Sequence, residues 1–417
     1  MSRRFTTLAV LMVALAISLP AWATNGDNLI GVGPVSRAMG GVGVAAPQDA
    51  ISAVFANPAA MCFGPFCPGA EVNFAGTAFM PNVSASVTNS LGTFKADSKD
   101  NVYPIPAIGL SVPITNDPTK WRFGLAAYGV TGLGVDYRGT SLDDPTAFTP
   151  PGAPLIAGEY TNLQIMKFAP AVGWQISPKW AVGLAVHIDY ANLDLRNGSS
   201  PGYSFGFQPG IIWQPTDNWS FGLNYVSSQS VDHTNVMATP TGSADLTLEA
   251  PQQATVGAAY TFLNGRFLVE GNAKWVNWAN ADGYSDFGWK DQWVFAIGGQ
   301  YQVIEKLFLR LGYNFGNNPV EENNSWTGTD IINVQGTDFF RYYYETFRII
   351  GFPAIVEQHF TAGIGYQFTE RFRLDLGFMY APENTITETG TDIYGGPATI
   401  EASLSEIGVD FGLTWRF

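Results

Sequence analysis

The chain has 417 residues, a formal net charge of −14 and two cysteines. Charged residues make up 13% of the sequence, about half the usual share for a soluble domain, whereas aromatic residues make up 14%. This acidic balance excludes nucleic acid as a partner, because neutralising phosphate groups requires lysine and arginine. The body of the chain has no long apolar run. That excludes transmembrane helices but not membrane-spanning strands, whose alternating pattern hydropathy windows do not detect.

The first residues have the features of a secretory signal peptide. Arg3 and Arg4 give a positive start, residues 8–19 form a short apolar stretch, and Ala21-Trp22-Ala23 matches a small-x-small cleavage site. Residues 1–23 are therefore a predicted signal peptide. We expect the mature chain to start at Thr24, in the periplasm or beyond it.

Residues 24–69 are rich in glycine and alanine, carry almost no charge, and match neither a long strand nor a long helix. Asp49 is a predicted N-cap of a short helix with the sequence AISAVF, and Asn57-Pro58 ends that helix. A compact segment of small residues ahead of a large sheet predicts a plug inside a barrel. Such a plug would block free diffusion.

Cys62 and Cys67 follow directly after this helix. In an oxidising compartment, two cysteines at this spacing predict a small structural disulfide. A metal site would need more ligands, and no histidine lies nearby in the sequence. We expect neither a metal ion nor another cofactor.

From residue 70 onward the sequence predicts an all-β structure. In the last strand, apolar residues from Ile407 to Phe417 share one parity, and small or charged residues such as Asp410 share the other. Other segments repeat this alternation with aromatic residues near their ends, as a membrane barrel with interfacial aromatic girdles requires. The predicted strands are 70–88, 102–115, 121–137, 158–176, 179–196, 203–214, 218–231, 252–262, 265–278, 291–303, 306–317, 357–368, 371–383 and 404–417.

Parity alone does not distinguish a membrane barrel from a water-soluble sandwich, whose faces are reversed. The connections do distinguish them, because tight turns alternate with long loops at 138–157, 232–251, 318–356 and 384–403. This pattern predicts a 14-stranded antiparallel transmembrane β-barrel formed by residues 70–417, with both termini on the periplasmic side. Residues 24–69 are then the plug on that side.

The third predicted strand is interrupted by Gly129, Gly132 and Gly134. Glycines within a strand weaken pairing and mark a bulge or a close approach of other backbone. A bend here would either open the wall sideways or only form a barrel corner. The residues alone leave both interpretations open.

The predicted inner face becomes apolar toward the end with the long loops. A porin for hydrophilic solutes would keep polar walls throughout. Apolar inward residues predict either a pocket for an apolar ligand or packing against a folded loop or the plug. These residues are Tyr103, Ile105, Leu163, Ile165, Leu193 and Leu195.

Three basic residues also face inward by parity, namely Lys167, Arg310 and Arg373. Each is a candidate partner for a ligand carboxylate. Each is equally a candidate ion-pair partner for an inward-facing acid such as Glu270, Asp375 or Asp410.

The segment GPVSRAMGGVGVAAPQDAISAVFANPAAM resembles the N-terminal hatch of the FadL/TodX family of outer-membrane transporters of hydrophobic compounds. The matching positions are Asp49-Ala50 and Asn57-Pro58-Ala59, and similar segments such as PAVGWQISPKWAVGLAV and LRLGYNFGNNPV extend over most of the mature chain. The resemblance implies a 14-strand barrel plugged by the hatch, in the outer membrane of a Gram-negative bacterium. The sequence departs from the family pattern at Pro47-Gln48, at the cysteine pair and at a long insertion around FFRYYYETFRIIGFPAIVEQH.

The resemblance also implies a function. Family members capture a hydrophobic molecule outside and release it through a lateral opening beside a kinked third strand after the hatch shifts. We therefore expect passive, ligand-gated uptake of long-chain fatty acids or related molecules by a monomer. Its partners would be the ligand, outer-membrane lipid and lipopolysaccharide, and the barrel-assembly machinery that reads Phe417.

Alternatives are an aromatic-hydrocarbon or alkane channel of the same family, a general porin and an outer-membrane lipid hydrolase. A hydrolase would need His187, His233 or His359 to activate a serine, and no G-x-S-x-G motif is present. His187 and Asp189 face inward together, but an inward histidine among polar residues is more often structural. We therefore do not expect an enzyme.

Overall fold

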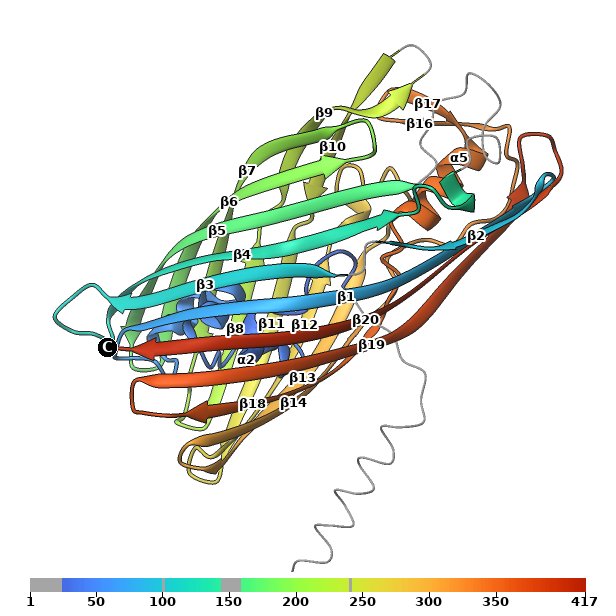
Figure 1. The fold of residues 1–417 in the computed structure, drawn as a ribbon. Helices are drawn as coiled ribbons and strands as arrows, with labels where there is room; N and C mark the ends of the chain where they lie inside the picture. The colour runs from blue at the N-terminus through green and yellow to red at the C-terminus, as the bar shows by residue number, and fades with distance from the viewer. Residues whose placement is uncertain (1–24, 100–101, 144–158, 240–241) are drawn as a thin grey trace, which may run out of the picture.

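The computed structural model describes residues 25–99, 102–143, 159–239 and 242–417. The predicted signal peptide, Thr24 and most of the predicted loop 138–157 lie outside these residues. The described chain forms a closed antiparallel β-barrel with short helices inside it (Figure 1). The barrel strands are β1 (Glu71–Asn89), β3 (Tyr103–Pro113), β4 (Trp121–Asp136), β5 (Tyr160–Ser177), β6 (Trp180–Asp194), β7 (Ser199–Trp213), β8 (Trp219–Val226), β11 (Gln253–Phe262), β12 (Phe267–Val276), β13 (Gln292–Ile304), β14 (Leu307–Gly316), β18 (Gln358–Gln367), β19 (Phe372–Thr391) and β20 (Pro397–Arg416).

The first and last strands close the barrel. β1 pairs with β20 from Glu71↔Arg416 to Thr88↔Thr399, and each remaining barrel strand pairs with its neighbours in chain order. Each of the 14 predicted strands corresponds to one barrel strand, so the predicted fold class is confirmed. We call the end with the short connections and Phe417 the turn end, and the opposite end the loop end (Figure 1).

Alternation of side chains along each strand produces the two faces of the wall. Phe411 and Trp415 are 54% and 49% exposed on the outside, whereas Asp410, the residue before Phe411, is fully buried. Paired indoles line the outer face near the turn end, with ring centroids 5.1 Å apart for Trp121 and Trp174 and 5.6 Å for Trp180 and Trp213. An apolar outer face with aromatic residues at its border matches lipid as the surrounding medium.

Two predicted loops are largely regular structure. The prediction of a loop at residues 384–403 is wrong, because β19 and β20 continue as a ladder from Asn384↔Leu404 to Thr391↔Pro397. The outward face of this ladder carries polar residues such as Thr385 and Ser403, whereas Ile386, Ile400 and Leu404 on its inward face are buried in a large apolar cluster. The predicted loop 232–251 contains most of the hairpin of β9 (Gln229–Thr239) and β10 (Gly242–Ala250).

Loop-end segments fold over the mouth of the barrel. They include β2 (Gly92–Asp97), β15 (Asn324–Trp326), β16 (Ile331–Val334), β17 (Thr337–Phe340), α5 (Arg341–Thr346) and a π-helical turn, η4 (Phe347–Gly351). Tyr342, Tyr343 and Phe347 belong to a large apolar cluster with the outer ends of the barrel strands. Arg348 forms buried ion pairs with Glu345 and Glu388 within it. Residues 318–356 therefore close the loop end.

None of the helices in the described part of the chain is long and apolar enough to cross a membrane.

Candidate functional site

The N-terminal segment, residues 25–69, lies inside the barrel toward the turn end (Figure 1). Its regular parts are α2 (Gly33–Arg37), α3 (Ala50–Ala56) and a 3-10 turn, η1 (Pro58–Cys62). The side chain of Asp49 accepts a hydrogen bond from the Ser52 backbone N–H at 2.8 Å, so the predicted N-cap is confirmed. Ala50 opens the helix behind this cap.

Asn57 connects the end of α3 to the barrel wall. Its side-chain oxygen accepts a hydrogen bond from Ala59 N–H at 3.1 Å and caps η1, which begins with Pro58. Its amide nitrogen donates to the carbonyl oxygens of Val44, Ile211 and Leu223 at 2.9, 3.1 and 3.4 Å. One side chain therefore joins two parts of the segment to β7 and β8.

A ring of glycines in the wall surrounds the N-terminal segment. At each of these glycines, a Cβ atom would lie within 3.2 Å of an atom of the segment. Gly222 of β8 is typical, because its Cβ would stand 2.1 Å from the carbonyl oxygen of Val44. Every barrel strand except β1 and β12 contributes, through Gly109, Gly124, Gly173, Gly183, Gly210, Gly222, Gly257, Gly298, Gly312, Gly363, Gly377, Gly408 and Gly412. We call this set the glycine ring.

The two strands outside the glycine ring use acidic and amide side chains instead. Glu270 of β12 accepts hydrogen bonds from the N–H groups of Gly43, Ala45 and Ala46 at 2.9–3.0 Å. On β1, Glu71 and Asn73 accept from the first two N–H groups of α3. On β1 and β12, side-chain hydrogen bonds thus hold the N-terminal segment to the wall in place of the close backbone contacts that the glycines allow.

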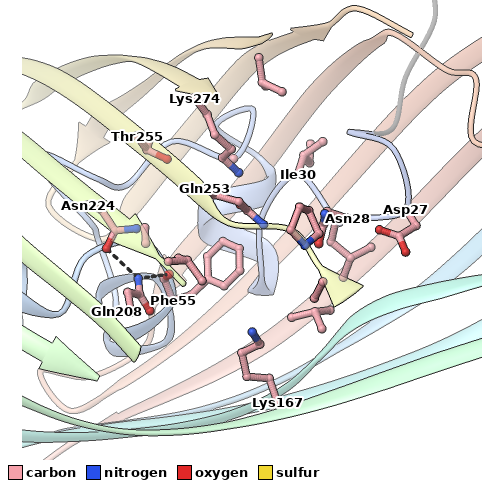
Figure 2. A pocket seen from close by; sticks show the side chains of 18 of the residues that line it. Asp27, Asn28, Ile30, Phe55, Lys167, Gln208, Asn224, Gln253, Thr255 and Lys274 are labelled. Atoms are coloured by element: carbon pink, nitrogen blue, oxygen red, sulfur yellow. Dashed lines mark hydrogen bonds between the residues drawn. The ribbon is translucent and has the colours of Figure 1, made fainter. Parts of the chain in front are cut away.

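A cavity of about 80 Å³, which we call the lumen cavity, lies on the loop-end side of the segment (Figure 2). The segment contributes Leu29, Ile30, Val44 and Phe55 to its lining. Wall residues Tyr128, Val130, Ile165 and Val226 add further apolar surface. Apolar groups from both the N-terminal segment and the barrel wall therefore bound the cavity.

One wall of the lumen cavity carries a buried polar network. Lys167 forms an ion pair with Asp189 at 3.2 Å, and its ammonium lies 3.2 Å from Nδ1 of His187. Nε2 of His187 lies 2.9 Å from Gln208, which also donates to the Phe55 carbonyl (Figure 2). His187 thus contacts lysine and glutamine rather than a serine, so this network lacks the nucleophile that a hydrolase requires.

Lys274 of β12 extends into the lumen cavity from the side opposite Lys167 (Figure 2). The described residues give its ammonium neither an ion pair nor a hydrogen bond. By contrast, Arg310 and Arg373 both pair with Asp375, at 2.8 and 2.6 Å. Lys167, Arg310 and Arg373 thus each pair with an acid, whereas Lys274 has no acidic partner within the described residues.

The six predicted lining residues separate into three groups. Ile165 lines the lumen cavity, and Leu163 joins it around a neighbouring cavity of about 10 Å³. Leu193 and Leu195 pack in the apolar cluster of the loop end, as Leu163 also does. Tyr103 and Ile105 pack against the small cluster of Ile30, Phe79 and Met379.

The wall is irregular at β4. Its ladder with β5 has a bulge between Gly129 and Thr131, and its ladder with β3 ends at Ala107↔Tyr128. Within the described residues, β4 beyond Tyr128 has no ladder partner in β3. The Val130 carbonyl instead accepts a hydrogen bond from the Leu29 N–H of the N-terminal segment at 3.2 Å.

The predicted glycines lie at this break. A Cβ on Gly129 would meet the Ile105 side chain at 2.7 Å, whereas one on Gly132 would meet nothing within 4 Å. Gly132 and Gly134 line a cavity of about 30 Å³, the wall cavity, together with Asp27 and Leu29. The predicted bulge is therefore present, and a space in the wall accompanies it.

Comparison with known proteins identifies the family. The family model described as outer membrane protein transport protein (OMPP1/FadL/TodX) matches residues 13–201 and 194–327. The chain belongs to this family. It is therefore an outer-membrane β-barrel transporter for hydrophobic compounds. A search of curated proteins finds no match.

Solved structures of similar fold support this membership of the OMPP1/FadL/TodX family. The toluene transporter TodX of Pseudomonas putida is 18% identical, with a TM-score of 0.65 over 94% of this chain and 99% of that one. A FadL homologue of Pseudomonas aeruginosa is 14% identical, with a TM-score of 0.63 over 95% and 99%. The toluene transporter TbuX of Ralstonia pickettii is 16% identical, with a TM-score of 0.62 over 94% and 99%.

The cysteine pair differs from the prediction, because both cysteines are free thiols in the structure. Cys62 faces β5, where its Sγ lies 3.3 Å from the position of a Cβ on Gly173. The Cys67 thiol interacts instead with the Arg122 guanidinium. The two side chains are therefore directed to different neighbours.

Sequence reasoning missed Asp27, Leu29, Lys274 and Tyr284, all of which line the lumen cavity. Asp27 and Leu29 lie in a segment without periodicity, so no pattern indicates where their side chains point. Tyr284 lies in a connection between β12 and β13. Lys274 had a detectable signal, because it shares the inward parity of Glu270 on the same strand.

Proposed function

We propose that this protein takes up long-chain fatty acids or related hydrophobic molecules by passive, ligand-gated diffusion, with lateral release beside β4. The observation that carries the proposal is the position of the lumen cavity next to the break in the β4 wall. Only the N-terminal residues around Asp27 and Leu29 separate the two. In this proposal residues 25–69 act as a hatch whose first residues move when ligand arrives.

The size of the lumen cavity requires such a movement. Its volume of about 80 Å³ is smaller than the ~150 Å³ of an engineered cavity that holds one benzene molecule. A long acyl chain therefore enters only if some of the lining moves. Leu29 belongs to this lining and is joined to β4 by one backbone hydrogen bond.

The free energy of binding is sufficient for this movement. Each methylene of a ligand gains about 0.8 kcal/mol on leaving water. A hydrogen bond contributes about 1 kcal/mol net, so two or three buried methylenes offset the loss of the Leu29–Val130 bond. A chain of fatty-acid length exceeds this requirement several times over.

Lys274 favours acids over plain hydrocarbons as the ligand. Its ammonium faces the lumen cavity without a partner among the described residues (Figure 2). A cation in a mostly apolar site is stabilised by a carboxylate and gains nothing from toluene or an alkane. Hydrocarbon uptake remains the second candidate, because two similar structures are those of toluene transporters.

The experiment is uptake into proteoliposomes. Oleate should enter at a rate that saturates with concentration, and sucrose should be excluded because the hatch closes the bore. Lys274→Met should lower oleate affinity by about tenfold, the value of one charge-assisted hydrogen bond, and leave toluene entry unchanged. Entry of sucrose without oleate would contradict the proposal, and toluene entry without oleate would favour the hydrocarbon channel. The purified protein should not hydrolyse lipid esters.

A further inference from the structure

Three cavities follow one another through the outer half of the barrel. The cavity of about 10 Å³ near Leu163, the outer cavity, shares five lining residues with the lumen cavity, namely Ile165, Asp189, Gln229, Ala250 and Tyr284. The lumen cavity of about 80 Å³ in turn shares Asp27 with the wall cavity of about 30 Å³ beside Gly132. The first boundary therefore includes Tyr284, and the second includes Asp27.

Asp27 and Tyr284 are hydrogen-bonded to each other, with the Tyr284 hydroxyl donating to the Asp27 carboxylate. Both side chains are at least 92% buried. Tyr284 lies where the outer cavity meets the lumen cavity, and Asp27 lies where the lumen cavity meets the wall cavity. One hydrogen bond thus connects these two boundaries.

Close packing fixes the two partners. The Tyr284 ring lies 4.6 Å from that of Trp278 and 4.8 Å from that of Trp289, measured between centroids. Gly26, which precedes Asp27, packs against the same indoles, and a Cβ there would stand 2.7 Å from Trp278. The start of the N-terminal segment and the β12–β13 connection therefore hold one another.

The bonded pair also has connections toward each end of the path. On the loop-end side, Asp286 accepts hydrogen bonds from the Gln335 side chain at 2.7 Å and from the Tyr344 hydroxyl at 2.8 Å. On the wall side, Leu29 is bonded to Val130 at the β4 bulge. A continuous series of contacts thus runs from the loop-end hairpin β16–β17 to the break in the wall.

We propose that the Asp27–Tyr284 hydrogen bond is a latch that couples ligand entry from the loop end to opening of the β4 exit. This inference rests on the proposed uptake function. A ligand that moves from the outer cavity into the lumen cavity displaces the Tyr284 side chain, and this removes the hydrogen-bond donor of Asp27. Residues 27–29 then leave the boundary with the wall cavity, and the path to β4 opens.

The first test needs no ligand. Hydrogen exchange of the Leu29 amide reports whether its bond to Val130 is closed. Tyr284→Phe removes only the hydroxyl, and exchange at Leu29 should become about tenfold faster, as expected for loss of one supporting hydrogen bond. Tyr343→Phe is the matched control, because the Tyr343 hydroxyl is buried near the loop end without a hydrogen-bond partner. This control should exchange like the wild type.

A second pair of variants distinguishes the latch from a general loss of packing. Asp27→Asn keeps an oxygen that accepts from Tyr284 and should retain slow exchange at Leu29. Asp27→Leu keeps the branching at Cγ without an acceptor and should exchange as fast as Tyr284→Phe. Wild-type exchange at Leu29 in both Tyr284→Phe and Asp27→Leu would overturn the latch.

Transport measurements separate this inference from the proposed function. Tyr284→Phe should admit oleate at low concentration faster than the wild type, because the exit is already partly open. If the wild type carries no hydrophobic compound while Leu29 exchange still responds to Tyr284→Phe, the proposed function fails and the structural coupling stands. If the wild type carries oleate, and Tyr284→Phe changes neither Leu29 exchange nor uptake, the latch is contradicted and the proposed function stands.

Discussion

Gly183 of β6 lies so close to the N-terminal segment that a Cβ would stand 2.3 Å from the Ala59 backbone nitrogen. Backbone cannot give way as a flexible side chain does, so Gly183→Ala should destabilise docking of the segment by about 1–3 kcal/mol, the usual cost of overpacking. Proteolysis of the segment from the turn end would measure this. Gly271→Ala of β12 is the control, because its nearest neighbour would be 3.8 Å away. Equal protease resistance of the two variants would contradict the role of the glycine ring.

Asp27 should make docking of the N-terminal segment depend on pH. Burial raises the pKa of Asp27 from 3.8 to about 7, against the opposing effect of the Tyr284 hydrogen bond. The native state therefore holds a proton that the unfolded state releases. The resulting stabilisation is complete below the unfolded pKa and is lost as pH rises through about 7.

The measurement is Leu29 amide protection, after correction for intrinsic exchange, which should fall progressively between about pH 4 and pH 7 in the wild type. Lys167, Asp189 and Lys274 line the same cavity as Asp27, and Glu406 lines the wall cavity. Asp49 is a second titrating group of the segment, since burial raises its pKa to about 6. Asp27→Asn isolates the contribution of Asp27, and an unchanged pH profile in this variant would assign the effect to those other groups.

At the scale of elements, the loop of residues 41–47 forms the part of the plug that β12 holds. Glu270 accepts three backbone N–H groups from it, and each hydrogen bond to a charged group contributes about 1.5–3 kcal/mol. Glu270→Ala should therefore free this loop and admit sucrose in a liposome-swelling assay. Glu305→Ala, on an exposed turn, should leave sucrose excluded. Sucrose exclusion in both variants would show that the remaining contacts suffice.

A large side chain placed at the break in β4 should block release of the ligand. Because a Cβ on Gly132 would meet no atom within 4 Å, a side chain can be attached there without a clash at its first carbon. Gly132→Phe should fill the wall cavity and reduce oleate uptake several-fold while the barrel stays folded. Ala258→Phe, on the outer face of β11, adds the same ring facing lipid and should transport normally. Full activity of Gly132→Phe would rule out lateral release at this position.

The barrel strands could be predicted from the sequence because period-two alternation reports which face meets lipid. The extension of β19 and β20 beyond residue 383 could not, since the pattern reverses there: the outward Thr385 and Ser403 are polar, whereas Ile400 is buried against the loop-end segments. The folded loop end was missed for a different reason. Tyr342, Tyr343 and Phe347 are buried by contacts with distant strands, which local patterns do not contain.

Of the candidate site, the sequence predicted the components better than their assembly. The cap at Asp49, the helix end at Asn57-Pro58 and the irregularity at Gly129 all follow from backbone requirements that single residue types reveal. The lumen cavity was located only in part, through Ile165, because its other apolar lining is divided between the aperiodic N-terminal segment and residues of several other strands and connections. Lys274, unlike Arg310 and Arg373, could be recognised as available only once the partners of each cation were known.

At the scale of the whole molecule, the barrel and the N-terminal segment should be separable in function. The closed ladder from β1 to β20 includes no strand from the segment, so deletion of residues 24–69 should leave a folded barrel. Its bore would then be open, and planar-bilayer recordings should show a conductance several-fold above that of the intact protein. A deletion variant that folds and still conducts as little as the intact protein would show that the loop end alone seals the pore.

The glycine ring also constrains the order in which the protein folds. Arg37 meets Gly408, and Ile51 meets Gly109, so the segment contacts strands formed from nearly the first to nearly the last part of the chain. A finished barrel would leave too little clearance for its helices to pass these positions. The segment must therefore be in place, with its short helices formed, before β1 pairs with β20. Closure of that seam is then the step that traps it, and the two ends of the polypeptide complete their folding together.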